Sequence, residues 1–351
     1  MKRLANISVF LLSVIFLISC ESTNSPGSGG GASGEWLIPS DQVFDGGPGQ
    51  DGIPALENPA FLNANNQEYL GDKDLVIGLK SGNSVKAYPH PILDWHEIIN
   101  DEINGKKLAI TYCPLTGSAI IWNRVIDGKE TTFGVSGLLY NTNLIPYDRE
   151  TGSRWSQMKL ECVNGELIGK FIKTDKLVET TWKTWKEMYP GTAVVSNSTG
   201  YARSYGVYPY GDYKTNNNSL LFPIDNKDTR LPQKERVFGL IVAGVAKAFR
   251  ISSFGELTVS NDNSFSRPVV VVGSSSKNFT VAYERTFNNQ KLEFTALENQ
   301  LPIVMQDNLG NKWDIFGVAV EGPNAGQELK ATTSYIAFWF AWAAFYPNTA
   351  I

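Results

Sequence analysis

An internal repeat is the sequence feature that most constrains how this chain can fold. Residues 76–79 (VIGL) recur 161 positions later as residues 237–240 (VFGL). Further segments match in the same order, at first without any gap and later with a small change of spacing: 86–88 with 247–249, 122–124 with 283–285, 152–155 with 310–313, 182–185 with 339–342, and 189–192 with 346–349. A colinear series of this kind predicts two copies of one structural unit.

The repeat defines the domain organisation that we expect. Residues 72–196 form a first repeat and residues 234–351 a second one, with residues 197–233 as a connector between them. Connections of this length are usually functional or disordered, and the tyrosines of the connector argue against disorder. We expect the two duplicated halves to pack with pseudo-two-fold symmetry.

The pattern of each half predicts a strand-rich α+β fold. Short β-favouring runs are separated by Gly, Asn and Asp turns at 75–79, 108–112, 119–123 and 131–135. Helical spacing and an early proline predict a helix over Pro91–Asn100, and a second short helix is expected over Thr181–Tyr189. The long apolar run Tyr335–Tyr346 fits a buried helix better than a membrane span, which needs roughly 20 apolar residues.

The first residues predict export and lipidation. Lys2 and Arg3 precede a short apolar run, and Leu17-Ile18-Ser19-Cys20 matches a lipobox, so residues 1–20 are interpreted as a lipoprotein signal peptide. Residues 21–35 are rich in Gly and Ser, which predicts a flexible tether. We therefore expect a cell-envelope lipoprotein that faces outside the cytoplasm and is anchored to a membrane through lipid on Cys20.

The composition narrows the class of partner. The hydrophobic content of 42% is that of a packed globule, and a formal charge of −4 with a pI near 5.4 gives no basic surface for nucleic acid. No nucleic-acid partner is therefore expected, whereas a small-molecule ligand is compatible with the composition. Protein partners and a substrate cannot be named from it.

Differences between the repeats indicate where chemistry lies. His90 and His96 are the only histidines, and both fall in the first repeat together with Cys113. At the repeat spacing these three positions hold Ile251, Leu257 and Ser274, and Glu97 aligns with Thr258. We therefore place the candidate site in the first repeat and interpret the second repeat as a degenerate, structural partner.

The first hypothesis for this site is an envelope enzyme based on a thiol and an imidazole. Cys113 follows a predicted strand and precedes a proline, which suggests that a turn or a short helix begins there, and a thiol at the start of a helix has a lowered pKa. His96 would deprotonate the thiol, and Asp94, Glu97 or Asp101 would orient the imidazole. The predicted catalytic residues are Cys113, His96, Glu97 and Asp101.

Two other hypotheses use the same residues. His90, His96 and Cys113 form a ligand set typical of a mononuclear copper site for metal binding or electron transfer, with Met158 as a weak axial ligand. Alternatively, His96 only braces a turn and Cys113 packs as a small apolar side chain, as is expected of Cys162. The protein would then be a non-catalytic ligand-binding or structural lipoprotein.

A polar segment over residues 134–157 suggests a ligand pocket. It carries Tyr140, Asn143, Asp148 and Arg149, residue types that line polar pockets, and arginine binds carboxylate or phosphate in a bidentate way. Alternatively, this segment is a polar hairpin with Trp155 in the core. Trp313 stands at the matching position of the second repeat, which favours a core position for Trp155.

Several of these motifs resemble a known family. They are 93–98 (LDWHEI), 111–117 (TYCPLTG), 134–138 (GVSGL), 147–153 (YDRETGS) and 338–342 (FWFAW). Together they are similar to the bacterial and archaeal "domain of unknown function 3179" family, and the resemblance covers nearly the whole body. It implies that His96, Cys113, Asp148, Arg149 and Trp155 lie in signature motifs, and it implies no activity.

Overall fold

The computed structural model describes residues 34–351, so the lipobox, Cys20 and most of the predicted tether lie outside the described residues. The described chain is strand-rich with three α-helices of seven residues each, which confirms the α+β class. No helix in this part of the chain is both long enough and apolar enough to cross a membrane.

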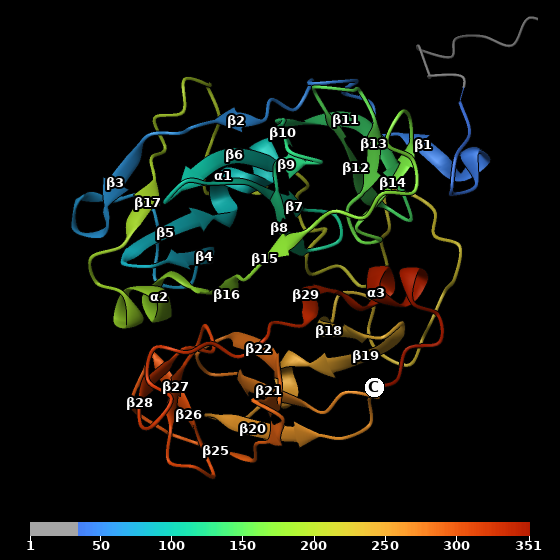
Figure 1. The fold of residues 1–351 in the computed structure, drawn as a ribbon. Coiled ribbons are helices and arrows are strands. Elements are labelled where there is room, and N and C mark those ends of the chain that lie inside the picture. Colours follow the sequence, from blue (N-terminus) through green and yellow to red (C-terminus); the bar gives the residue numbers. More distant parts are fainter. Residues whose placement is uncertain (1–33) are drawn as a thin grey trace, which may run out of the picture. The chain divides into compact units, whose positions relative to one another are not determined.

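The first half of the described chain contains three five-stranded sheets (Figure 1). One has the order β16 (Val178–Thr181), β4 (Leu75–Ser81), β5 (Ser84–Pro89), β17 (Ala193–Val195) and β3 (Phe61–Asn63). The next has the order β15 (Thr174–Asp175), β8 (Ser118–Asn123), β7 (Lys106–Cys113), β6 (Ile98–Ile103) and β2 (Leu56–Glu57). The third has the order β1 (Val43–Asp45), β11 (Phe133–Tyr140), β12 (Asn143–Asp148), β13 (Arg154–Ser156) and β14 (Glu161–Asn164).

Short elements complete this half. They are the helices α1 (His90–His96) and α2 (Trp182–Met188), the ribbon of β9 (Val125–Ile126) with β10 (Lys129–Glu130), and the 3-10 turns η1 (Ser40–Gln42) and η2 (Ala64–Asn66). Thr181 caps α2 by accepting a hydrogen bond from the Thr184 backbone N–H, so the helix expected at this place is confirmed.

The remainder of the chain forms smaller sheets. One has the order β19 (Val245–Arg250), β18 (Arg236–Val242) and β29 (Thr333–Phe338), and the second has β20 (Thr258–Asp262), β21 (Val269–Ser274) and β22 (Phe279–Glu284). The third has β25 (Phe294–Ala296), β26 (Ile303–Asp307), β27 (Lys312–Asp314) and β28 (Ala319–Glu321). A ribbon of β23 (Thr286–Phe287) and β24 (Gln290–Lys291), the turn η3 (Ile251–Ser253) and the helix α3 (Trp339–Phe345) complete it.

Several pairings of the first half occur again in the second half. The order β16-β4-β5 corresponds to β29-β18-β19, β6-β7-β8 to β20-β21-β22, and β11-β12-β13-β14 to β25-β26-β27-β28. Side-chain contacts correspond as well. The Trp155 indole N–H donates to Asp148 and that of Trp313 donates to Asp307, each at 3.0 Å.

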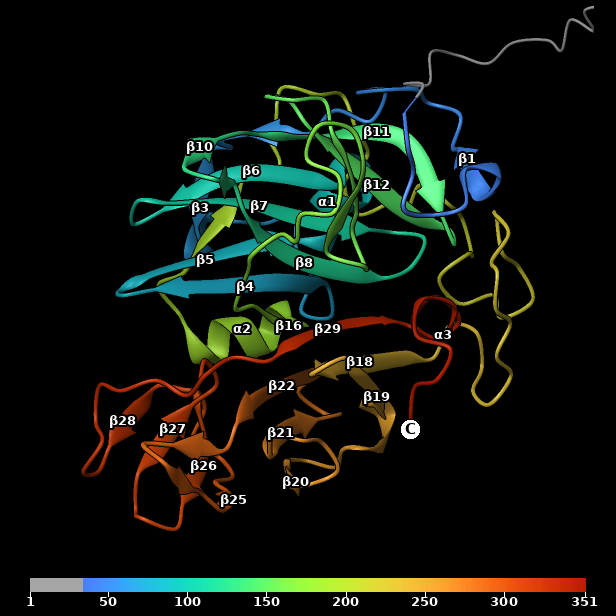
Figure 2. The same cartoon turned by 45° about the vertical axis from the view of Figure 1, so that its right-hand side comes forward.

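The two halves pack against one another through matching elements. In the first core cluster, Trp339 and Trp342 of α3 lie with Trp122 and Trp155 of the first half. In the second cluster, Trp182 and Trp185 of α2 lie with apolar residues of β21, β22 and β26. Figure 2 shows β16 and β29 at the boundary between the halves, as Figure 1 does. Each half therefore inserts its tryptophan helix into a core shared with the other.

Two expected helices are wrong in their extent. The helix α1 ends at His96, not at Asn100, because Glu97 adopts a positive φ of 57° and the β-branched residues that follow pair with β7 as strand β6. The run 335–346 is not one helix. Its first four residues belong to β29, which pairs with β18, and α3 begins at Trp339.

Candidate functional site

The turn after α1 brings Glu97 close to the end of β7. The backbone N–H of Glu97 donates to Leu93 at 2.8 Å, and its carbonyl accepts from Tyr112 at 2.7 Å. Since Cys113 follows Tyr112 as the last residue of β7, the carboxyl of Glu97 and the thiol of Cys113 lie in the same neighbourhood. Both side chains are buried, with 6% and 1% of their surface exposed.

The thiol of Cys113 is held in its neutral form. Its sulfur lies 3.8 Å from the carbonyl oxygen of Thr142, to which the S–H donates. Burial and the nearby Glu97 raise the pKa of Cys113 to about 11. The expectation of a lowered pKa at a helix start is therefore wrong, because residues 114–117 form a turn rather than a helix.

Glu97 is a buried acid with no cationic partner among residues 34–351. Burial raises the pKa of its carboxyl to about 8, Asp94 adds to this shift, and a hydrogen bond with the hydroxyl of Tyr210 opposes it. A carboxylic acid with this pKa is mostly protonated at neutral pH, so Glu97 can donate a proton as well as accept one. Thr258 occupies the matching position in the second half.

The structure does not pair His96 with Cys113. The Nδ1–H of His96 donates to the carbonyl oxygen of Pro54 at 2.7 Å, and the Nε2 atom accepts from the hydroxyl of Tyr205 at 2.6 Å. Burial lowers the pKa of His96, which keeps the ring neutral and consistent with these two roles. Since both ring nitrogens have partners other than Cys113, the geometry gives no support to His96 as the base for the thiol.

The three residues of the copper hypothesis do not converge. His90 stacks on Tyr112 with ring centroids 4.3 Å apart, and its Nε2 atom lies 3.7 Å from a carboxylate oxygen of Glu179. His96 is turned to Pro54 and Tyr205 instead. The described residues contain no group of three or more His, Cys, Asp or Glu side chains placed to hold a metal ion. The geometry therefore gives no support to the metal hypothesis.

The connector covers this region. It forms neither helix nor strand between β17 and β18, and its side chains dock on the turn that carries Glu97 and on the loop after Cys113. The Tyr208 hydroxyl donates to the carbonyl oxygen of Pro114 at 3.0 Å, and Lys214 forms a 2.9 Å ion pair with Asp94. Burial raises the pKa of Asp94 to about 6 although Lys214 opposes the shift.

A buried lysine lies at the end of the connector. The ammonium of Lys234 has no hydrogen-bond partner among the described residues and faces the rings of Tyr213, Phe340 and Phe338 at 3.2, 4.6 and 5.6 Å. Burial lowers the pKa of Lys234 to about 7, and the three rings stabilise the charged form that burial disfavours. No sequence pattern indicated Lys234 or Tyr210, because both reach the region only through the path of the connector.

A buried polar network supports the loop after Cys113. The Asn143 amide donates to Thr116 at 2.9 Å and to Gln157 at 2.7 Å, and Ser118 donates to Gln157 at 2.8 Å. The Gln157 amide in turn donates to Thr111 at 3.0 Å. In the second half, Val272, Phe279 and Ile315 stand at the positions that match Thr111, Ser118 and Gln157. The network, like Glu97 and Cys113, is present in one half alone.

Two predicted site residues are part of the scaffold. Asp101 accepts from Lys86 and from Tyr88, each at 2.7 Å, and the pair Lys247–Asp262 repeats the first contact in the second half. Asp148 accepts from the backbone N–H of Thr151 and from the Trp155 indole, and Asp307 makes the matching contacts. Because a contact of each acid recurs in the second half, both acids fit a role in the scaffold.

The predicted ligand-binding residues do not gather in one pocket. Arg149 pairs with Glu57 and Asp51, the Tyr140 hydroxyl donates to Asp225 at 2.7 Å, and Asn143 belongs to the buried network. Arg149 and Tyr140 therefore fasten the N-terminal segment and the connector to the first half.

A cavity of about 250 Å³ lies beside Glu97. Glu97 and Tyr210 supply its acidic and hydroxyl groups, and most of the remaining lining is apolar. Cys113 does not line the cavity itself, but Leu144 does, and the backbone N–H of Leu144 hydrogen-bonds to the Cys113 thiol. A molecule bound in this cavity would therefore contact Glu97 directly. It would also contact Leu144, whose backbone is hydrogen-bonded to the thiol of Cys113.

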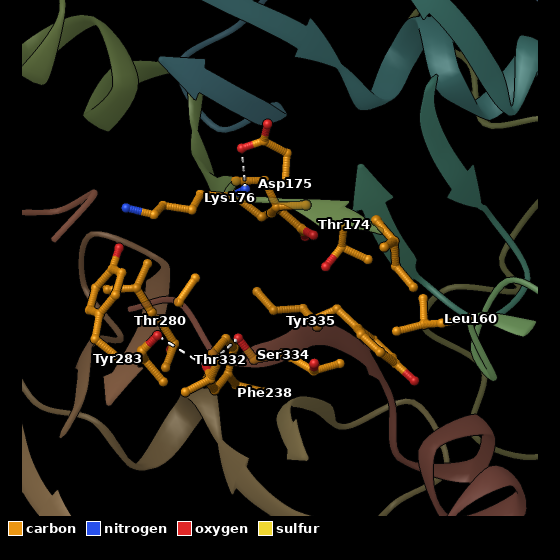
Figure 3. A pocket seen from close by; sticks show the side chains of 18 residues that line it. Leu160, Thr174, Asp175, Lys176, Phe238, Thr280, Tyr283, Thr332, Ser334 and Tyr335 are labelled. Carbon is orange, nitrogen blue, oxygen red and sulfur yellow. Dashed lines mark hydrogen bonds between the residues drawn. The ribbon is translucent and has the colours of Figure 1, made fainter. Parts of the chain in front are cut away.

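A second hollow lies between the halves, where Figure 3 shows Lys176 and Thr174 facing Tyr283, Thr332 and Tyr335. Its volume is about 60 Å³. This holds a few water molecules at most, since one water needs roughly 10–15 Å³ of such space. The crevice is therefore part of the contact between the halves and is too small for a substrate.

Comparison with known proteins gives a family and no function. A family model described as "Protein of unknown function (DUF3179)" matches residues 50–349. No curated protein and no solved structure matches the chain.

Proposed function

The chain belongs to the DUF3179 family of proteins of unknown function, and we propose from its site that it is a thiol-dependent enzyme in which Glu97 is the proton partner of Cys113. One observation carries the proposal. The buried acid, the buried thiol and the polar network beneath them occur together in the first half, and Thr258, Ser274 and apolar residues replace them in the second.

The two groups complement one another chemically. A neutral thiol is a weak nucleophile and becomes a strong one when a base takes its proton. The ionised form of Glu97 can accept that proton, and its protonated form can return it to a reacting oxygen or nitrogen. The raised pKa values of both groups keep the pair neutral at rest, so a thiolate would form only as a substrate reacts.

Alkylation of the two cysteines tests the proposal. We expect a small uncharged alkylating agent, for example N-methylmaleimide, to modify Cys113 of residues 34–351 faster than Cys162, and the Glu97→Gln variant to lose most of this advantage. Cys162 is a matched control, because it is also buried and burial raises its pKa to about 11 as well. Equal modification of the two thiols in the folded protein, with no effect of Glu97→Gln, would refute the proposal.

We also propose how this domain arose and where it works. The matching strand orders and the reciprocal packing of α2 and α3 support a gene duplication with pseudo-two-fold symmetry, after which the second half became a structural partner. The basic start, the short apolar run and the lipobox support a cell-envelope lipoprotein held to a membrane by Cys20.

The anchor has a direct test. In a bacterial host, Cys20→Ala is expected to abolish lipidation and leave the unprocessed precursor, which labelling with a fatty-acid analogue and the mass of the protein would show. Cys162→Ala, which leaves the lipobox intact, is the control. Incorporation of the label into Cys20→Ala would contradict the assignment.

A further inference from the structure

The cavity beside Glu97 indicates the class of molecule that the site takes. We infer that it binds a small, uncharged and mainly apolar molecule through a carbonyl oxygen, which accepts a hydrogen bond from protonated Glu97. This inference rests on the proposed function, since it names the substrate class of that same site.

The walls of the cavity select for apolar surface. Strand β11, strand β12, the N-terminal segment and the connector contribute Ile53, Val135, Leu138, Leu139, Leu144 and Phe222. The volume of about 250 Å³ exceeds the roughly 150 Å³ of a dry cavity that holds benzene, so it accommodates a ring with a short substituent. Removal of such surface from water is the main source of affinity in sites of this kind.

The corresponding cavity of the second half has a more charged lining. This cavity of about 180 Å³ is lined by Glu298 and Asn299, which align with Gly137 and Leu138 of the first cavity. Its rim carries the charged side chains Glu256, Glu298 and Lys277. The apolar lining around a single acid is therefore a feature of the first half, and the fold does not impose it.

The polar end of the cavity selects for a hydrogen-bond acceptor. No lysine or arginine lines it, so an anionic ligand finds no counter-charge among the described residues. Glu97 is mostly protonated below pH 8 and then presents an O–H group, to which a carbonyl oxygen is the matching partner. The thiol of Cys113 lies behind the cavity wall, where it is hydrogen-bonded to the backbone N–H of the lining residue Leu144.

Binding of three probes of similar size tests the inference. Calorimetry with residues 34–351 at pH 6.5 should show acetophenone binding roughly 5- to 10-fold more tightly than ethylbenzene, the expected worth of one added hydrogen bond. Acetophenone should also bind more tightly than the cation of 1-phenylethylamine. Its affinity should fall above pH 8 in the natural protein and remain constant in Glu97→Gln, because the amide keeps an N–H donor at every pH.

Two variants test whether acetophenone binds in this cavity or elsewhere on the protein. Leu139→Phe fills the first cavity and should reduce acetophenone affinity at least tenfold, whereas Leu301→Phe in the second cavity should not change it. Preferred binding of the amine, or acetophenone affinity that neither Leu139→Phe nor pH alters, would overturn the inference. Neither result would affect the cysteine alkylation, so failure of this inference and failure of the proposed function are distinguishable.

Discussion

Glu97 shows how one backbone conformation positions a reactive group. A positive φ ends α1 directly after His96, and the next residue begins the strand that pairs with β7. Left-handed backbone is unfavourable for residues other than glycine, and such conformations are frequent at functional sites. Here it places a carboxyl group near a thiol in a buried region against which the connector packs.

The buried Glu97 carboxyl should make stability depend on pH. Its pKa is about 8 in the folded protein and near 4.5 when the chain is unfolded, so folding favours its protonated form. The corresponding stability is complete below pH 4.5 and is lost as the pH rises through 8, at up to about 1.4 kcal/mol per pH unit. Chemical denaturation should therefore show that Glu97→Gln gains stability relative to the natural protein between pH 6.5 and 8.

The comparison of variants isolates this effect. The pKa of Asp94 is raised to about 6, so its titration changes the stability mainly below pH 6.5. The pKa of Lys234 is lowered to about 7, but Lys234 is present in both proteins, so its effect cancels in the comparison. Glu102→Gln is the control, because a salt bridge with Lys107 lowers the pKa of Glu102 and moves its effect below pH 4.5. A stability difference between Glu97→Gln and the natural protein that stays constant over this window would show that the acid is not buried as described.

At this scale the sequence pointed to the first repeat, and the structure gives Cys113 a different neighbour from the one expected. The absence of His96, Glu97 and Cys113 from the matching positions of the second repeat indicated the candidate site, because residues that the fold itself requires should occur in both repeats. Helical spacing extended α1 through Glu97 and so made His96 the natural partner for the thiol. The spacing of apolar residues does not predict that a single residue, Glu97, adopts a left-handed conformation. It also does not predict that the connector brings Tyr205 to His96.

At the scale of elements, each repeat packs a tryptophan of its last helix onto a glycine of its first strand. A Cβ atom at Gly78 would lie 2.1 Å from the ring of Trp185, and one at Gly239 would lie 2.0 Å from the ring of Trp342. The two indole N–H groups donate to Thr192 and Thr349 at 3.0 and 2.9 Å, which fixes both rings. The sequence showed these glycines and tryptophans as repeated, but it did not show that they touch.

Alanine at either glycine should therefore destabilise the protein to a similar degree. Both tryptophans are fully buried and cannot move aside, so we expect Gly78→Ala and Gly239→Ala each to cost about 3 kcal/mol or more, at or above the upper range for overpacking. Gly191→Ala, where the added methyl group meets no atom within 4 Å, should cost much less. Denaturant unfolding of the three variants measures this, and a neutral Gly239→Ala would contradict the equivalence of the contacts.

At the scale of the whole molecule, the connector binds both halves, and its contacts change from one half to the other between residues 225 and 226. The carboxylate of Asp225 accepts from Tyr140 of the first half, whereas the next residue, Asn226, donates to the carbonyl oxygen of Ala343 in α3. The backbone carbonyl of Asp228 accepts from the Trp339 indole at 3.2 Å. A cut between residues 225 and 226 would therefore leave these hydrogen bonds within the fragment to which each belongs.

Neither fragment should fold alone after such a cut. Residues 34–225 would lose the α3 residues that share a core cluster with Trp122 and Trp155, and residues 226–351 would lose the α2 residues that share a cluster with β21, β22 and β26. Each large apolar side chain contributes roughly 1.5–3 kcal/mol when buried, and the loss of several exceeds the roughly 5–15 kcal/mol that stabilises a typical protein. Co-expressed fragments should instead form a stable one-to-one complex with a cooperative thermal transition, whereas each fragment alone should aggregate or show none. A cooperative transition in either isolated fragment would mean that its core is complete without the other half, and the shared cores would then not be what holds the molecule together.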